Sequence, residues 1–268
     1  MSKLLVLSVL LISTVAHATE PGVVLKQTAQ RPEYAKLIAD RGAAVVTVKA
    51  VLQIKSGGGG GSDRASEVEV PGVVIDATGL VLCSNTMLGG FMPRFGGSGP
   101  GVSVVPSDLK VLFGTDTDGV DARLLARDSE LDLAWVQIKS LGDRKLTVID
   151  VTHAVPPVIG DDLLSLHRMG KQYARVPVIM EGRLAGVTQK PRSLLLMTGD
   201  RAPGVPIFLP NGQLVGISAL QVSDDDDRGG RGGARNLGQP RFGTIVLPGA
   251  EIAKATVRAK EPADTEQQ

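Results

Sequence analysis

Many short β-branched stretches separated by turn residues make up most of this chain of 268 residues, and they constrain its fold more than any other feature. From residue 43 onward, runs rich in Val, Ile, Leu and Thr alternate with Gly, Pro and Asp. Such spacing, without helical patterns between the runs, is typical of antiparallel barrels and sandwiches. The predicted strands are 43–54, 68–75, 80–84, 109–113, 119–126, 131–138, 162–168, 173–187, 192–197, 205–209, 213–220 and 243–247.

Two short helices flank the predicted strands. Residues 31–40 suit a helix with Pro32 in its first turn, where proline is tolerated, and Gly42 ends it. Residues 249–258 form the second predicted helix, with Ile252 and Val257 expected on its packed face.

The N-terminus has the pattern of a secretory signal peptide. Lys3 precedes an apolar run over residues 4–15, and residues 16–18 (Ala-His-Ala) match a small-residue cleavage site. The apolar run is too short to cross a bilayer. We therefore expect residues 1–18 to be removed and the protein to be periplasmic or secreted.

Charge and cysteine content set two further limits. The chain has 29 Lys and Arg, one of them Lys3, against 28 Asp and Glu, so the exported chain carries no net charge. A neutral chain offers no overall attraction to nucleic acid or anionic lipid. Cys83 is the one cysteine, so no internal disulfide can form, and we interpret it as a small buried hydrophobe at a strand end.

Three segments have the pattern of a known protease framework. Residues 71–86 read PGVVIDATGLVLCSNT, residues 128–138 read DSELDLAWVQI, and residues 200–217 combine a proline-containing turn with NGQLVGI. They resemble the HtrA/Deg branch of the trypsin-like serine proteases, where they deliver the base histidine, the orienting aspartate and the nucleophile. The resemblance covers about residues 43–258. No PDZ module is recognised after it.

The resemblance implies an all-β fold of two antiparallel six-stranded barrels with short N- and C-terminal helices. Residues 1–18 would be the signal peptide, and residues 19–42 an N-terminal segment with a short helix. The first barrel would span residues 43–148 and the second residues 149–247, followed by a C-terminal helix and tail over 248–268. The cleft between the barrels would correspond to the family's active site.

The family's catalytic positions carry residues that cannot perform the chemistry. Thr86 stands at the base position, Pro203 at the nucleophile position and Arg201 at a glycine of the oxyanion hole, whereas Asp132 keeps the orienting position. A serine hydroxyl needs an adjacent base, and proline has neither a hydroxyl nor a backbone N–H. We expect no intact catalytic site. We expect Asp132 to accept hydrogen bonds near Thr86 or from backbone N–H groups.

The remaining candidates offer little replacement chemistry. After signal removal only His153 and His167 remain, and neither occupies a matched position. No His or Cys spacing matches a zinc site, and the aspartates at 224–227 lack the alternation of a calcium loop. We expect neither a metal nor another cofactor. The glycines at 57–61 and the charged stretch 224–233 are predicted to be mobile surface loops.

These observations favour an exported pseudoprotease that binds peptide or protein partners through the old interbarrel cleft or through its loops. An active HtrA/Deg-type serine endopeptidase with relocated catalytic residues is the first alternative. A structural or interaction protein of the cell envelope is the second. The sequence identifies neither the partner nor the oligomeric state.

Overall fold

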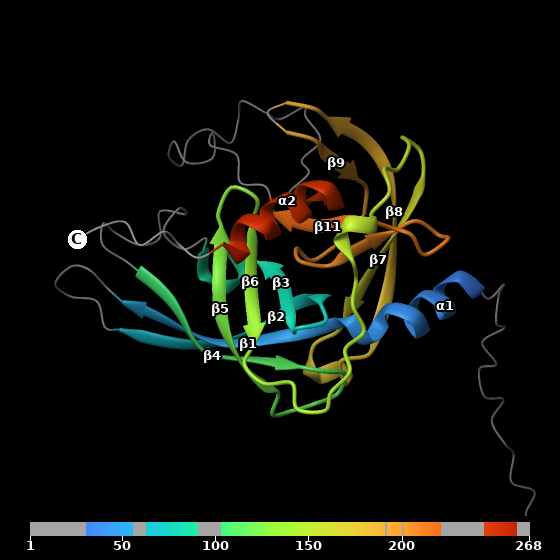
Figure 1. The fold of residues 1–268 in the computed structure, drawn as a ribbon. Coiled ribbons are helices and arrows are strands. Elements are labelled where there is room, and N and C mark those ends of the chain that lie inside the picture. Colours follow the sequence, from blue (N-terminus) through green and yellow to red (C-terminus); the bar gives the residue numbers. More distant parts are fainter. Residues whose placement is uncertain are drawn as a thin grey trace, which may run out of the picture. The chain divides into compact units, whose positions relative to one another are not determined.

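The computed structural model describes residues 31–55, 63–90, 103–190, 192–199, 201–220 and 244–261 (Figure 1). The predicted signal peptide and the predicted loops at 57–61 and 224–233 lie outside these residues. The structural statements that follow concern the described residues.

Two closed antiparallel barrels of six strands each form the fold, which confirms the predicted fold class. The strand orders are β1-β2-β3-β6-β5-β4 and β7-β8-β9-β12-β11-β10, so the second barrel repeats the connectivity of the first. The strands of the first barrel are β1 (Val45–Lys55), β2 (Arg64–Asp76), β3 (Leu80–Ser84), β4 (Ser103–Leu112), β5 (Val120–Asp128) and β6 (Leu133–Ile138). Those of the second are β7 (Asp162–Arg168), β8 (Pro177–Thr188), β9 (Leu194–Met197), β10 (Pro206–Phe208), β11 (Leu214–Leu220) and β12 (Thr244–Pro248).

Both predicted helices are present, and one of their predicted contacts is wrong. The helices are α1 (Pro32–Arg41) and α2 (Gly249–Lys260), with short helical turns η1 (Gly42–Ala44), η2 (Thr86–Gly90), η3 (Val151–His153) and η4 (Lys171–Tyr173). Ile252 is fully buried as expected, but Val257 is 62 % exposed. The packed face of α2 continues at Ala255 and Thr256, three and four residues on. Val257 is five residues from Ile252, about 140° around the helix, so it points away.

Two strands begin earlier than predicted, and the added residues are exposed or only partly buried. β2 starts at Arg64 and β4 at Ser103, and both pair with the end of β1, where Ile54 lies opposite Arg64 and Val104. Residues near these strand starts are mostly exposed, so they show no apolar run in the sequence. β8 starts later than predicted, because residues 173–176 belong to a turn in which Ala174 and Arg175 have positive φ.

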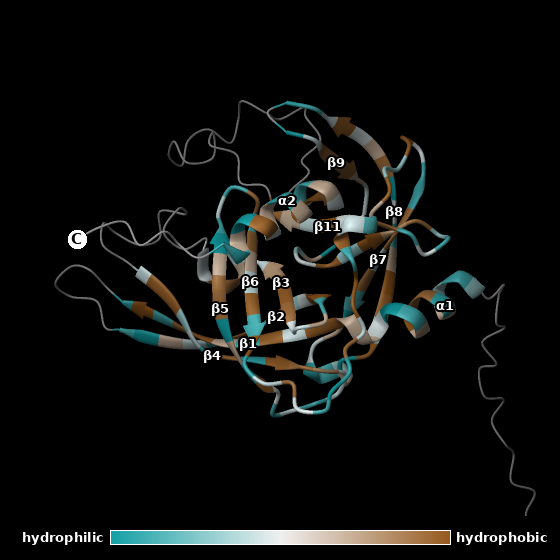
Figure 2. Cartoon of the chain, in the orientation of Figure 1, coloured by the Kyte–Doolittle hydropathy of each residue, from teal (hydrophilic) through white to brown (hydrophobic). Residues whose placement is uncertain are grey.

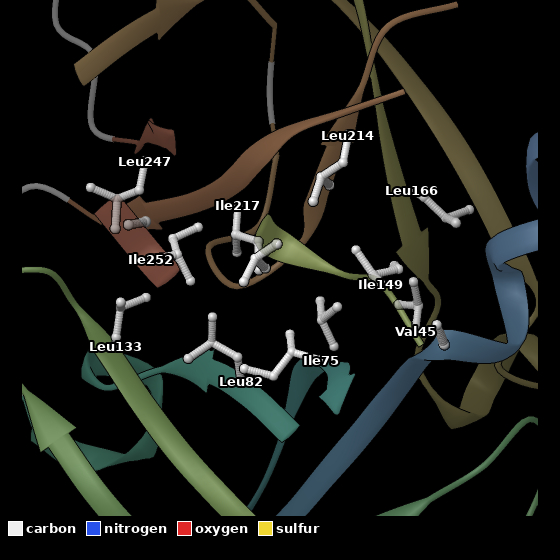
Figure 3. Packing of buried hydrophobic residues seen from close by; sticks show 14 of the residues in the cluster. Val45, Ile75, Leu82, Leu133, Ile149, Leu166, Leu214, Ile217, Leu247 and Ile252 are labelled. Atoms are coloured by element: carbon white, nitrogen blue, oxygen red, sulfur yellow. The ribbon is translucent and has the colours of Figure 1, made fainter. Parts of the chain in front are cut away.

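Three hydrophobic clusters organise the packing. One fills the first barrel and one the second. The third draws residues from both barrels and from α2, and Figure 3 shows Leu82 and Leu133 of the first barrel near Ile217 and Leu247 of the second and Ile252 of α2. Figure 2 shows hydrophobic colours along strands of both barrels. The barrels are therefore joined by a continuous apolar contact, not by a flexible linker alone.

Two arginines, Arg168 at the end of β7 and Arg175 in the turn before β8, reinforce the contact between the barrels. Arg168 donates through Nε to the carbonyl of Val45 at 2.7 Å and through Nη2 to the carbonyl of Gly42. Arg175 donates to the carboxylate of Glu69 on β2 at 2.6 Å. Arg168 also donates to the carbonyl of Arg175, so the two residues are linked to each other. Both side chains form hydrogen bonds to strands of the first barrel.

Candidate functional site

Asp132 lies in a tight turn between β5 and β6. Asp128 starts this turn by accepting the backbone N–H groups of Glu130 and Leu131 at 3.0 and 2.9 Å. Asp132 itself has φ of +56°, a left-handed conformation that aspartate tolerates better than most residues. The turn directs the carboxylate inward, where Asp132 is only 3 % exposed.

Three donors occupy the Asp132 carboxylate. The hydroxyl of Ser84 lies 3.0 and 2.8 Å from its two oxygens, Thr86 donates its backbone N–H to Oδ1 at 2.7 Å, and Leu220 donates its backbone N–H to Oδ2 at 2.8 Å. The acceptor role expected for Asp132 near Thr86 is therefore present. Leu220 ends β11 of the second barrel, so this carboxylate ties the two barrels together.

The segment that carries Thr86 folds back beside Asp132. Asn85 donates its backbone N–H to the carbonyl of Asp132 at 3.1 Å. Arg127 donates to the side chain of Asn85 at 2.9 Å and to the carbonyl of Leu88 at 3.0 Å. Burial lowers the pKa of the Arg127 guanidinium below its ordinary range. These contacts place Thr86, which is partly buried, beside the Asp132 carboxylate.

The loop that holds Pro203 is fixed by Ser218 of β11. Gly204 donates its N–H to the Ser218 carbonyl at 2.7 Å, and Val205 donates its N–H to the Ser218 hydroxyl at 3.0 Å. The Ser218 hydroxyl in turn lies 2.7 Å from the carbonyl of Ala202. Because Pro203 has no N–H and the next two amides are already bonded, none of these three residues can donate to an oxyanion.

The Pro203 loop approaches the first barrel closely at Gly204. Gly204 has a φ of +85°, a left-handed conformation that favours glycine. A Cβ there would lie 3.1 Å from the backbone nitrogen of Ser84. The loop therefore passes beside the strand end that delivers Ser84. This contact brings the Pro203 loop to the side of the Asp132 site, as the resemblance implies.

Arg201 directs its side chain into the second barrel. Its guanidinium donates to the carbonyls of Gly199 and Thr244 at 2.7 Å and to that of Met197 at 2.8 Å. It therefore bridges the end of β9 and the start of β12. The Arg201 side chain therefore stabilises the loop through these hydrogen bonds.

Comparison with known proteins identifies the fold. No family model matches the sequence, and no curated protein matches it. Among solved structures, Deg5 superposes with a TM-score of 0.54 at 14 % identity, covering 84 % of this chain and 91 % of Deg5. The chain has the fold of the HtrA-type proteases. The HtrA-type protease AlgW, solved with a tripeptide, superposes with a TM-score of 0.52 at 15 % identity over 84 % of this chain. This chain spans 62 % of AlgW.

His167 and Ser165 form a buried pair within the second barrel of this HtrA-type fold. His167 Nε2 lies 2.8 Å from the hydroxyl of Ser165, which donates to the carbonyl of Met180 at 3.0 Å. Because the Ser165 proton is used in that bond, the imidazole donates to Ser165 and does not act as its base. Ser165 is fully buried, so no substrate reaches its oxygen.

Because of His167, the stability of the fold should fall as the pH is lowered from about 6.5 to about 4. Burial, aided by the charge of Arg201, lowers the pKa of His167 from 6.5 to about 4. Between these values the unfolded chain binds a proton that the folded chain does not, so folded-state stability decreases as pH falls through this window. The shift corresponds to about 3 kcal/mol at most.

Urea unfolding between pH 7 and pH 4 would measure this effect as the difference between the unaltered protein and His167→Gln. Gln cannot be protonated, so the variant should lose less stability across the window. Parallel curves for the two proteins would contradict the assignment.

His153 lies on the surface, away from the Asp132 site. Its Nδ1 lies 2.7 Å from Asp150, and its side chain is 84 % exposed. No serine or cysteine contacts it within the described residues. Cys83 is fully buried with its Sγ 3.6 Å from the carbonyl of Ala134, and burial raises its pKa to about 12, which fits the predicted inert thiol.

Sequence reasoning placed Thr86, Asp132 and Pro203 but missed Ser84 and Ser218. Both serines use their hydroxyls to bond residues distant in sequence, Asp132 and Ala202 respectively. Their positions at or near strand ends were visible in the sequence, but the residues they would bond were not.

Among the described residues, no three His, Cys, Asp or Glu side chains are grouped so that they could hold a metal ion. No helix in the described part of the chain is long and apolar enough to span a membrane.

Proposed function

We propose that this protein is a non-catalytic relative of HtrA-type proteases that binds extended peptide segments in the cleft between its barrels. The observation that carries the proposal is the occupied carboxylate of Asp132. Ser84, Thr86 and Leu220 supply its donors, and Thr86, not a histidine, stands at the base position beside it. An orienting aspartate without a histidine has no catalytic role.

The Pro203 loop supports the same proposal independently. It offers no hydroxyl at the nucleophile position, and the amides of Gly204 and Val205 are bonded to Ser218. Arg201 holds the loop through carbonyls of the second barrel. Removal of one oxyanion donor costs about 100- to 1000-fold in rate, and here several requirements are missing together.

Relocated catalytic residues have little support. The Ser165–His167 pair is buried and its hydrogen bonds run in the wrong direction for nucleophile activation. His153 has an orienting carboxylate in Asp150 but no serine or cysteine partner among the described residues.

We expect the protein neither to hydrolyse casein nor to be labelled by a fluorophosphonate probe. The double variant Thr86→His with Pro203→Ser should also remain unlabelled, because Arg201 still replaces the glycine of the oxyanion hole and its side chain stays bonded to carbonyls of the second barrel. The measurement is gel-based probe labelling, with an active HtrA-type protease as positive control. Labelling of the unaltered protein at one serine would favour the alternative of an active endopeptidase.

Peptide binding is supported by the retained framework around Asp132, which holds both barrels in an HtrA-type arrangement. The HtrA-type protease AlgW, whose fold is similar, was solved with a tripeptide. Extended peptides commonly bind such proteins by adding a strand, with backbone hydrogen bonds supplying much of the affinity. We infer that the cleft beside Thr86 takes an extended segment of a partner protein.

An array of immobilised extended peptides, probed with residues 19–268, tests this inference. Thr86→Trp should abolish the spots by filling the proposed cleft, because Trp is much larger than Thr and the backbone contact of residue 86 to Asp132 is kept. Val257→Trp adds the same side chain at an exposed position of α2 and should leave binding unchanged. Binding that both variants retain equally would favour an envelope interaction protein that uses its loops.

Export is part of the proposal. The supporting pattern is Lys3, the apolar run over residues 4–15 and the small residues at 16–18. Mass spectrometry of the protein purified from cells should find Thr19 or a neighbour as the first residue, and an intact N-terminus on most molecules would contradict export.

A further inference from the structure

A cavity that does not include Asp132 lies where the end of α1, the connection between the barrels and the β10–β11 turn meet. Its volume is about 420 Å³. Ile149, Phe208 and Leu214 form an apolar floor and are 2 %, 1 % and 7 % exposed. Arg41 and Gln213 contribute polar groups to its lining. A cavity of this size with an apolar floor and a few polar groups is suited to a small ligand.

Arg41 is the charged group of this cavity that lacks a partner. Within the described residues its guanidinium forms no hydrogen bond or ion pair, whereas Arg168 and Arg201, for example, each bond several carbonyls. Arginine offers planar, paired donors that match a carboxylate. The guanidinium therefore has donors to give to a ligand in the cavity.

Gln213 supplies a second donor. Its Oε1 accepts from Nδ2 of Asn211 at 2.7 Å, and its backbone N–H donates to Oδ1 of Asn211 at 3.0 Å. These two bonds fix the side chain and its amide orientation. The amide nitrogen of Gln213 consequently keeps its hydrogens for another acceptor.

Asp150 also lines the cavity, but its carboxylate is satisfied within its own turn. It accepts the backbone N–H of Thr152 at 2.8 Å and the Thr152 hydroxyl at 2.6 Å, and it lies 2.7 Å from Nδ1 of His153. The hydrogen bonds from Thr152 lower the pKa of Asp150, so its carboxylate is ionised and Nδ1 of His153 carries the proton. Asp150 therefore does not need Arg41 as a partner.

We propose that this cavity binds a carboxylate attached to a short apolar group, with the carboxylate on Arg41 and Gln213 and the apolar group against Phe208 and Leu214. The ligand is either a free short-chain acid or the C-terminal residue of a peptide, since both present the same chemistry. The site is separate from the peptide cleft beside Thr86, so its failure would leave the proposed function untouched.

Titration of the ¹⁵N-labelled mature protein with hexanoate, followed by two-dimensional NMR, tests this site. Saturable shifts are expected at the amides of Gly212 and Gln213 and not at Thr86. Hexanol, which has the same tail without the charge, should bind at least ~10-fold more weakly, because a charge-assisted contact is lost. Equal binding of hexanol and hexanoate, or no saturable shifts with hexanoate, would overturn the proposal.

Two variants and two peptides complete the test. Arg41→Gln and Gln213→Glu should each weaken hexanoate at least ~10-fold, the first by removing the cation and the second by adding a repelling charge. Arg123→Gln changes an exposed arginine of β5 outside the cavity and should have no effect. A tripeptide ending in leucine, compared with its C-terminal amide, distinguishes the two sources: tighter binding than hexanoate identifies a peptide terminus, and weaker binding a free acid. Hexanoate affinity unchanged by Arg41→Gln would overturn the assignment.

Discussion

Replacement of Asp132 by alanine is expected to destabilise the fold by about 3–6 kcal/mol. The variant would leave the Ser84 hydroxyl and the backbone N–H groups of Thr86 and Leu220 without their acceptor. A buried donor without a partner costs about 1–3 kcal/mol, and alanine also fits the left-handed backbone of this position poorly. Urea unfolding at pH 7 would measure the loss.

Two matched variants separate the causes. Asp132→Asn retains an acceptor oxygen and tolerates positive φ, so it should lose less stability than Asp132→Ala. Asp121→Ala removes an exposed carboxylate of β5 whose contact to Lys110 is 3.8 Å, and it should change stability by less than about 1 kcal/mol. An effect of Asp132→Ala no larger than that of Asp121→Ala would show that the three hydrogen bonds contribute little.

The strand framework could be predicted because its information is local. β3, β7 and β11 match predicted segments closely, since most of their buried residues are apolar and adjacent in the sequence. β2 and β4 extend beyond the prediction because exposed or partly buried residues at their starts, Val104 and Val105 among them, pair with β1. The local pattern of apolar residues indicates which residues are buried. It does not indicate which exposed residues pair with a neighbouring strand.

For the candidate site, the sequence could predict which residues stand at the family's catalytic positions, but not the hydrogen bonds that they form. The resemblance put Thr86 near Asp132, and the 2.7 Å contact between them agrees. It could not show that the Ser84 hydroxyl would bind the carboxylate, because that bond joins residues far apart in the chain. The direction of Arg201 was likewise hidden, because its acceptors are carbonyls that only the folded second barrel brings together.

Trp135→Ala is the second large effect, with an expected loss of about 3–5 kcal/mol. Trp135 lies on β6, is 1 % exposed and belongs to the cluster that joins the barrels. Its Nε1–H donates to the hydroxyl of Thr256 in α2 at 3.0 Å, and that hydroxyl donates to the carbonyl of Ile252 at 2.8 Å. The indole therefore attaches α2 to the first barrel, and its removal would leave a cavity and take away one of the two hydrogen bonds of the Thr256 hydroxyl.

A double-mutant cycle separates packing from the hydrogen bond. Trp135→Phe keeps most of the buried ring and removes the donor, and Thr256→Val keeps the volume and removes the acceptor. Each should cost about 1–2 kcal/mol, and the double variant should cost less than the sum, because the bond is lost once. Strict additivity in urea unfolding would mean that the 3.0 Å contact contributes no stability and that Trp135 acts through packing alone. In both cases, the larger loss of stability expected for Trp135→Ala measures the contribution of apolar packing between α2 and β6. β6 is the strand that follows Asp132.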